Sequence, residues 1–157
     1  MTTISSGEQR IPARDPSTLP PVQEVRTYVI SATVQGGLLQ FYFSSKPPAP
    51  NFPDDQPLLI RVPDNCRIVL TLDTALQWQF RSDGDAITLG GTARPFYFNL
   101  VLETPQRVSF YALFNDNNDY VNNRDPYNIY LNLAQAGTPQ LLAIRIDPDI
   151  ENPGDHH

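Results

Sequence analysis

Short stretches in which apolar and polar side chains alternate dominate this chain and constrain its fold most. In residues 66–73 (CRIVLTLD) and 76–81 (LQWQFR), every second residue is apolar, so that apolar side chains line one face. This is the pattern of a half-buried β-strand. No stretch shows the spacing of an amphipathic helix over three turns, and 16 prolines interrupt the 157 residues, which disfavours helices further. We therefore expect an all-β fold.

The number and spacing of these stretches indicate the architecture. About 8–9 strands separated by turn signals predict an antiparallel β-sandwich, immunoglobulin-like or jelly-roll-like. A closed barrel is the alternative, because alternation does not show whether a sheet closes on itself. The inward faces should share a core of aromatic side chains, namely Trp78, Phe80, Phe98, Phe110 and Phe114.

The distribution of prolines suggests the domain boundaries. Residues 1–24 carry four prolines and no apolar periodicity, so they are expected to form a flexible proline-rich tail or a strap across the surface. Residues 25–147 then form a single β-sandwich domain, within which the proline-rich residues 45–57 are a crossover loop. Residues 148–157 are expected to be a C-terminal tail.

Residue counts exclude several kinds of catalysis. His156 and His157 are the only histidines, Lys46 is the only lysine and Cys66 is the only cysteine, which argues against histidine-based triads, phosphate-binding lysine loops and thiolate zinc sites. Cys66 begins an alternating strand and is expected to be a buried, inert thiol. Acidic turns such as residues 83–85 are interpreted as solvated. No catalytic constellation is recognisable, so the chain is predicted not to be an enzyme.

Residues 115–125 form the most unusual polar segment. Asp116, Asn118, Asp119 and Asp125 offer the hard oxygen ligands that calcium prefers. The segment fails as an EF-hand, because valine stands at the sixth position, where glycine is needed. A loop-mounted calcium site is one interpretation, and no other cofactor is expected. The alternative is that these Asn and Asp side chains only stabilise turns.

Tyrosines on strand faces opposite the predicted core are candidates for ligand binding. Exposed tyrosines among Asn and Gln suit sugar stacking or a protein interface. The same residues also suit a second buried layer, or strands covered by the proline-rich segment. The candidates are Tyr97 and Tyr111 on the expected strands, together with Tyr120 and Tyr127 in the polar loop 115–128.

Charge and hydropathy bear on partners and location. The net charge of -6 argues against nucleic acid, because phosphate binding depends on Lys and Arg. No segment has the length or hydropathy of a membrane span, and the first ten residues do not resemble a signal peptide. We therefore expect a cytoplasmic protein without nucleic-acid or membrane partners, and a homodimer through exposed strands or a tyrosine-bearing face.

The C-terminal segment IRIDPDIENP (144–153) resembles the Asp-Pro signature of the DP-EP family of small bacterial all-β proteins. Residues 115–127 also show a faint similarity to the bacterial inclusion-body protein family. Both resemblances imply an all-β domain; the first family has no assigned function and the second is non-enzymatic. The sequence thus favours a binding or protein-interaction module, and the alternative is a calcium-dependent carbohydrate-binding module that uses residues 115–125.

Overall fold

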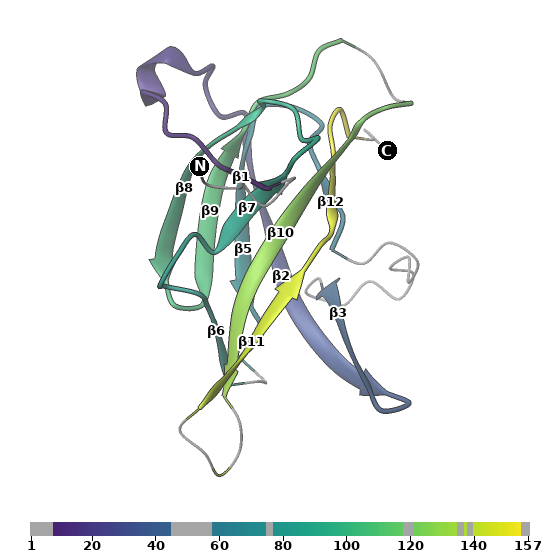
Figure 1. The fold of residues 1–157 in the computed structure, drawn as a ribbon. Helices are drawn as coiled ribbons and strands as arrows, with labels where there is room; N and C mark the ends of the chain where they lie inside the picture. The colour runs from purple at the N-terminus through teal and green to yellow at the C-terminus, as the bar shows by residue number, and fades with distance from the viewer. Residues whose placement is uncertain are drawn as a thin grey trace, which may run out of the picture.

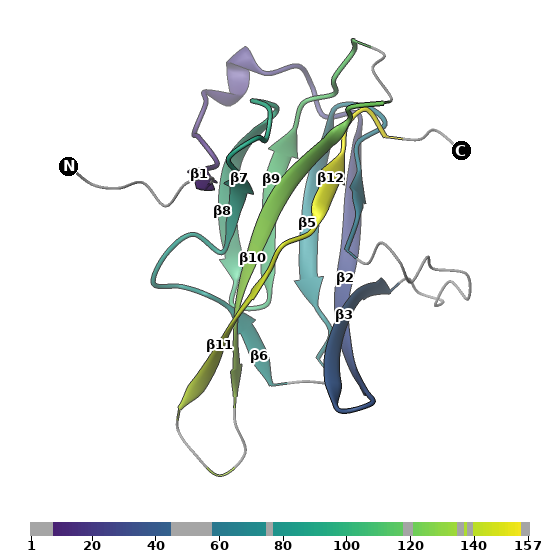
Figure 2. The ribbon, with the colours of Figure 1, turned by 45° about the vertical axis from the view of Figure 1, so that its right-hand side comes forward.

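Two β-sheets pack face to face in the computed structural model (Figures 1 and 2), which confirms the all-β, sandwich-like fold. The structure describes residues 8–44, 58–74, 77–117, 121–134, 137 and 140–154. The predicted crossover loop at 45–57 lies outside these residues. In the part of the chain that is described, no helix is long and apolar enough to cross a membrane.

The first sheet is organised around one long strand, β10, which pairs with β7 and then β6 along one edge and with β12 and then β11 along the other. The order across the sheet is β1-β7-β10-β12-β4. Its strands are β1 (Glu8–Arg10), β4 (Ile60–Arg61), β6 (Trp78–Phe80), β7 (Ile87–Gly90), β10 (Arg124–Ala134), β11 (Leu141–Ile146) and β12 (Asp149–Glu151).

The second sheet has the order β3-β2-β5-β9-β8. Its strands are β2 (Glu24–Gln35), β3 (Leu38–Ser44), β5 (Cys66–Leu72), β8 (Tyr97–Thr104) and β9 (Arg107–Ala112). Gly36 and Gly37 both have positive φ in the turn between β2 and β3, as expected for a glycine hairpin. β2 runs parallel to β5, and β12 runs parallel to β4. Both sheets are therefore mixed rather than purely antiparallel, and the described residues contain more strands than predicted.

Most of the aromatic residues predicted to form the core are buried there. Trp78, Phe80 and Phe110 are buried in the main apolar cluster. Phe98 is buried, with 8% of its surface exposed, but it is not part of this cluster: β8 places Tyr97 there, and Phe98 lies on the opposite face of the sheet beneath the guanidinium of Arg14. A register irregularity follows Phe98, where Asn99 has φ 61°, and such bulges change which residues face inward.

Phe114 also departs from the predicted core. It lies beyond the end of β9 and is only half-buried. The alternation of residues 107–114 therefore holds as far as Ala112, where the strand ends.

The N-terminal segment is a strap attached to both sheets, not a flexible tail, as far as it is described. Glu8–Arg10 forms β1 and pairs with β7, and Ile11 joins the core with 9% of its surface exposed. Asn99 in β8 then donates its backbone N–H to Pro12, and the Tyr111 hydroxyl donates to the Pro20 carbonyl. Figure 2 shows this segment, in purple, passing β8 on its way to β2.

The segment after Asp147 is likewise part of the first sheet, which corrects the expectation of a C-terminal tail. Asp149–Glu151 forms β12 between β10 and β4, and Asn152 is fully buried. Proline at position 148 ends β11, as expected for a residue that lacks an N–H donor, but the chain resumes pairing directly after it.

Replacing Trp78 by alanine tests the core assignment. The indole is 4% exposed, stacks on Phe41 with ring centroids 5.9 Å apart, and donates from Nε1 to the Asp73 carbonyl at 2.6 Å. We expect Trp78→Ala to lower the unfolding free energy by about 3–5 kcal/mol, measured by urea denaturation. Val101→Ala, on an exposed side chain, should change it by less than about 0.5 kcal/mol, and equal effects would contradict the assignment.

Candidate functional site

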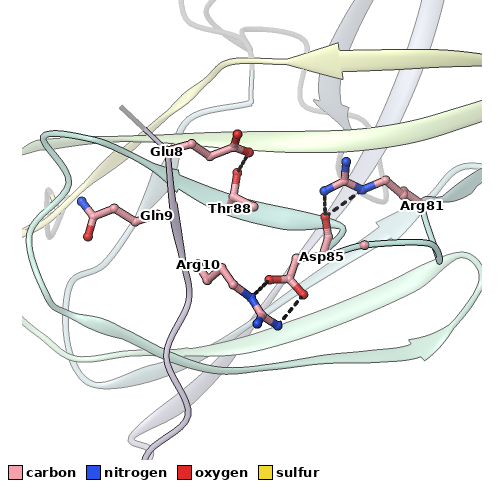
Figure 3. Close-up of a pocket in the computed structure, with 7 residues that line it drawn as sticks. Glu8, Gln9, Arg10, Arg81, Asp85 and Thr88 are labelled. Atoms are coloured by element: carbon pink, nitrogen blue, oxygen red, sulfur yellow. Dashed lines mark hydrogen bonds and ion pairs between the residues drawn. The ribbon is translucent and has the colours of Figure 1, made fainter. Parts of the chain in front are cut away.

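A polar pocket of about 380 Å³ lies on the outer face of the first sheet (Figure 3). It is formed by β1, β7 and the turn that joins β6 to β7. Its walls contain two carboxylates and two guanidinium groups, a combination suited to a charged or hydroxyl-bearing ligand. The lining residues are Glu8, Gln9, Arg10, Arg81, Gly84, Asp85 and Thr88.

The strand register explains why Glu8, Arg10 and Thr88 share one face. Arg10 lies opposite Thr88, and Thr88 lies opposite Asn128; directly paired residues project from the same side of a sheet. Tyr130 follows two positions after Asn128 and therefore projects from that side too. Arg145 is paired with Tyr130 and extends this polar surface onto β11.

Glu8 is held by two hydroxyl groups. Its Oε1 accepts a hydrogen bond from Thr88 Oγ1 at 2.6 Å and another from the Tyr130 hydroxyl. The Thr88 bond, followed by the Tyr130 bond, lowers the pKa of Glu8. Burial, followed by the bond to Glu8, raises the pKa of Tyr130. Near neutral pH the carboxylate is therefore ionised and the phenol keeps its proton.

Arg81 is fixed on the ring of the same tyrosine. Its Cζ lies 3.7 Å from the Tyr130 ring centroid, and its Nε and Nη2 donate to the Asp85 carbonyl at 3.1 and 2.6 Å. Gly84 leaves room for this arrangement, because an added Cβ would lie 3.1 Å from Arg81 Cζ. Stacking and paired hydrogen bonds together hold the guanidinium in one orientation.

Arg81 keeps its positive charge available in the pocket. The Asp85 carboxylate is engaged by Arg10, with Nε–Oδ2 2.7 Å and Nη2–Oδ1 3.3 Å. No ion pair within the described ranges involves Arg81, and its Nη1 makes none of the described hydrogen bonds. A fixed guanidinium with a free N–H edge can bind an anion such as phosphate.

A second hollow, of about 470 Å³, lies near the far end of β10 and differs in chemistry. None of its lining residues is charged, so it offers carboxamide and hydroxyl groups but no cation. An anionic ligand is therefore expected in the first pocket. The residues that line the second hollow are Thr71, Leu72, Thr74, Gln77, Trp78, Gln79, Gln106, Asn132, Ala134 and Leu141.

Only two of the four predicted calcium ligands, Asp116 and Asp125, lie among the described residues, and their surroundings differ. Asp125 is fully buried, because β10 begins at Arg124 and turns this carboxylate into the fold. There it pairs with Arg94 (Nε–Oδ1 2.8 Å, Nη2–Oδ2 3.0 Å) and accepts from the Tyr97 hydroxyl. Asp116 is exposed in a turn, and Asn118 and Asp119 lie outside the described residues. The parts of the chain that are described contain no group of three or more His, Cys, Asp or Glu able to hold a metal.

The candidate binding tyrosines are buried wherever they are described. Tyr97 and Tyr127 are fully buried, and the Tyr127 hydroxyl donates to the Leu58 carbonyl at 2.7 Å. Tyr111 is 5% exposed because the N-terminal strap covers it. Tyr120 lies outside the described residues. The prediction of an exposed binding face is therefore wrong for these three side chains. The alternatives apply to them instead: a second buried layer, or coverage by the proline-rich segment.

Cys66 behaves as predicted. It is fully buried in the core, and burial, the largest influence, raises the pKa of its thiol to about 12. The thiol therefore stays protonated and inert near neutral pH.

The comparison with known families gives one finding. The family pNTSase1, described as a predicted novel nucleotide synthetase, matches residues 12–155. The chain belongs to this family. The description corrects the expectation that the chain is not an enzyme. A search of curated proteins finds no significant match. The resemblance to the DP-EP family stays a prediction.

Sequence reasoning missed the residues of the pocket for two reasons. Treating the N-terminal segment as a tail removed Glu8 from consideration. The alternation of residues 76–81 puts Arg81 on the outward face together with Gln77 and Gln79, but nothing in the sequence indicates that Tyr130 lies beneath it. An arginine on the outward face of a strand was the one feature of the sequence that could have pointed to this pocket.

Proposed function

We propose that the chain is an enzyme acting on nucleotides, and that it binds its nucleotide in the pocket between β1 and β7 with the phosphates at Arg81. The observation that carries this proposal is the fixed guanidinium, which rests on the Tyr130 ring and leaves Nη1 free. Membership in a family described as a predicted nucleotide synthetase supports a nucleotide as the source of the anionic group.

The chemistry of phosphate transfer fits a site without a histidine base. Such reactions depend mainly on positioning and on stabilising the charge that develops on phosphoryl oxygens, with little covalent chemistry for the protein. A guanidinium that is already oriented supplies that stabilisation without reorganising during the reaction. Arg81 is the residue to which we assign this role.

Calorimetric titration with the magnesium salts of ATP, GTP, CTP and UTP tests the proposal. We expect at least one to bind, and Arg81→Gln to weaken that binding by about 10- to 100-fold, the value of a hydrogen bond to a charged group. Arg107→Gln is the matched control, because Arg107 pairs with Glu103 on the outer face of the other sheet. Chromatography of the same mixtures should reveal a nucleotide product that requires Arg81.

Two results would contradict the proposal. One is that none of the four nucleotides binds to the folded wild-type protein. The other is that Arg81→Gln and Arg107→Gln bind the nucleotide equally well, since binding would then be located elsewhere.

A further inference from the structure

We infer that Glu8 accepts a hydrogen bond from a ribose hydroxyl of the bound nucleotide, so that the pocket selects ribonucleotides over deoxynucleotides. This inference rests on the proposed function, because it assumes that the phosphates lie at Arg81. It adds the class of sugar and the residue that recognises it.

The carboxylate of Glu8 has one oxygen left for a ligand. Both hydroxyl donors, Thr88 and Tyr130, bind Oε1, and Oε2 accepts none of the described hydrogen bonds. Figure 3 shows the carboxylate at the pocket wall, with Thr88 bonded to one of its oxygens. An ionised carboxylate only accepts hydrogen bonds, so the group that pairs with Oε2 must be a donor.

Charge decides which part of a nucleotide lies at each end of the pocket. A phosphate would be repelled by the Glu8 carboxylate and attracted by the guanidinium of Arg81. Tyr130 contacts both groups, since its hydroxyl binds Glu8 and its ring lies under Arg81. A ligand with its phosphate on Arg81 therefore has its next portion, the sugar, near Glu8. The donors of a ribose are its 2′ and 3′ hydroxyls.

Neighbouring contacts fix Glu8 in place before any ligand arrives. The Gln9 side chain donates to the Gly90 carbonyl at 3.0 Å, and β1 pairs residue by residue with β7. An acceptor that is already oriented loses little entropy when a hydroxyl binds to it. Glu8 is half-buried, and a site built to hydrogen-bond a hydroxyl also discriminates against a substrate that lacks this group, because the acceptor then loses its partner.

Titration with sugar variants of the tightest-binding nucleotide tests this inference. The ribonucleotide, its 2′-deoxy form and its 3′-deoxy form are titrated as magnesium salts into wild-type protein. We expect one of the two deoxy forms to bind about 10- to 100-fold more weakly, the loss of a hydrogen bond to a charged group. In Glu8→Gln, which places an amide N–H where Oε2 lies, the ratio should fall to threefold or less.

Two further variants complete the design. Glu8→Ala removes the acceptor altogether and should abolish the preference, and its melting temperature shows whether it is folded. Glu103→Gln is the matched control and should keep the wild-type ratio. The Glu103 carboxylate also accepts side-chain hydrogen bonds, in its case from Ser109 and Arg107, but it lies on the other sheet.

Each outcome separates this inference from the proposed function. Equal affinity of wild-type protein for all three sugars overturns the ribose assignment, while loss of binding in Arg81→Gln would still support the phosphate site. A preference that persists in Glu8→Gln and Glu8→Ala also overturns it, because another residue would then read the sugar. Absence of binding for every nucleotide overturns both.

Discussion

A chain that begins at residue 24 should be less stable than the full protein by at least about 3 kcal/mol, the scale of losing one large core side chain and several hydrogen bonds. The deletion removes β1 from the edge of β7 and takes Ile11 out of the core. It also uncovers Phe98 and Tyr111, which now lie under Arg14 and Pro20. Equilibrium denaturation in urea measures the change.

Point variants distinguish loss of the strap from a general effect of truncation. Ile11→Ala should cost about 2 kcal/mol or more, because Ile11 packs in the core. Val22→Ala lies in the same segment but on an exposed side chain, and should change the unfolding free energy by less than about 0.5 kcal/mol. An unchanged denaturation midpoint for the truncated chain would show that residues 8–23 are a loose tail after all.

Asp125→Asn should lower the unfolding free energy by about 3–5 kcal/mol, because it leaves a partly buried cation without its counter-charge. Asp125 accepts from the Arg94 backbone and guanidinium and from the Tyr97 hydroxyl. Arg94 also donates to the Asn152 carbonyl at 2.7 Å. The carboxylate therefore connects β10 to β8 and to the segment that follows β12.

Asp116→Asn is the matched control for this change. It makes the same substitution on an exposed turn residue and should alter stability by less than about 0.5 kcal/mol. Thermal melting of both variants, with calcium and with chelator, measures the effect. A neutral result for Asp125→Asn would refute the structural role, and a destabilisation that appears only with calcium would restore the ligand hypothesis.

The alternation in the sequence was enough to predict the strands and most of the core, but it did not show for every residue which side of the sheet its side chain lies on. In β5 and β9 each inward residue follows the period of two, so alternation alone predicts the buried positions there, among them Ile68 and Phe110. In β8 the irregularity around Asn99 changes the register, so that Phe98 faces outward. A bulge of this kind at a non-glycine residue leaves no pattern in a single sequence.

The site was less accessible to sequence reasoning, because it depends on contacts between distant residues. Glu8 and Tyr130 are 122 positions apart, and their pairing follows from the register of β1, β7 and β10. The strand β1 is three residues long, which is too short for an alternating pattern of apolar and polar residues to reveal it in the sequence. Asp125 was misjudged for a related reason, since its burial depends on Arg94 and on the pairing of β10 with β12.

Two-dimensional nuclear magnetic resonance of isotope-labelled protein, titrated with the magnesium salt of the tightest-binding nucleotide, tests the central claim most directly. The account predicts that the amide signals of β1, β7 and residues 81–85 shift and saturate together with binding. It also predicts that the Arg81 side-chain signal moves with them. Shifts confined to the uncharged hollow around Gln79 and Asn132, with residues 81–88 unmoved, would contradict the account.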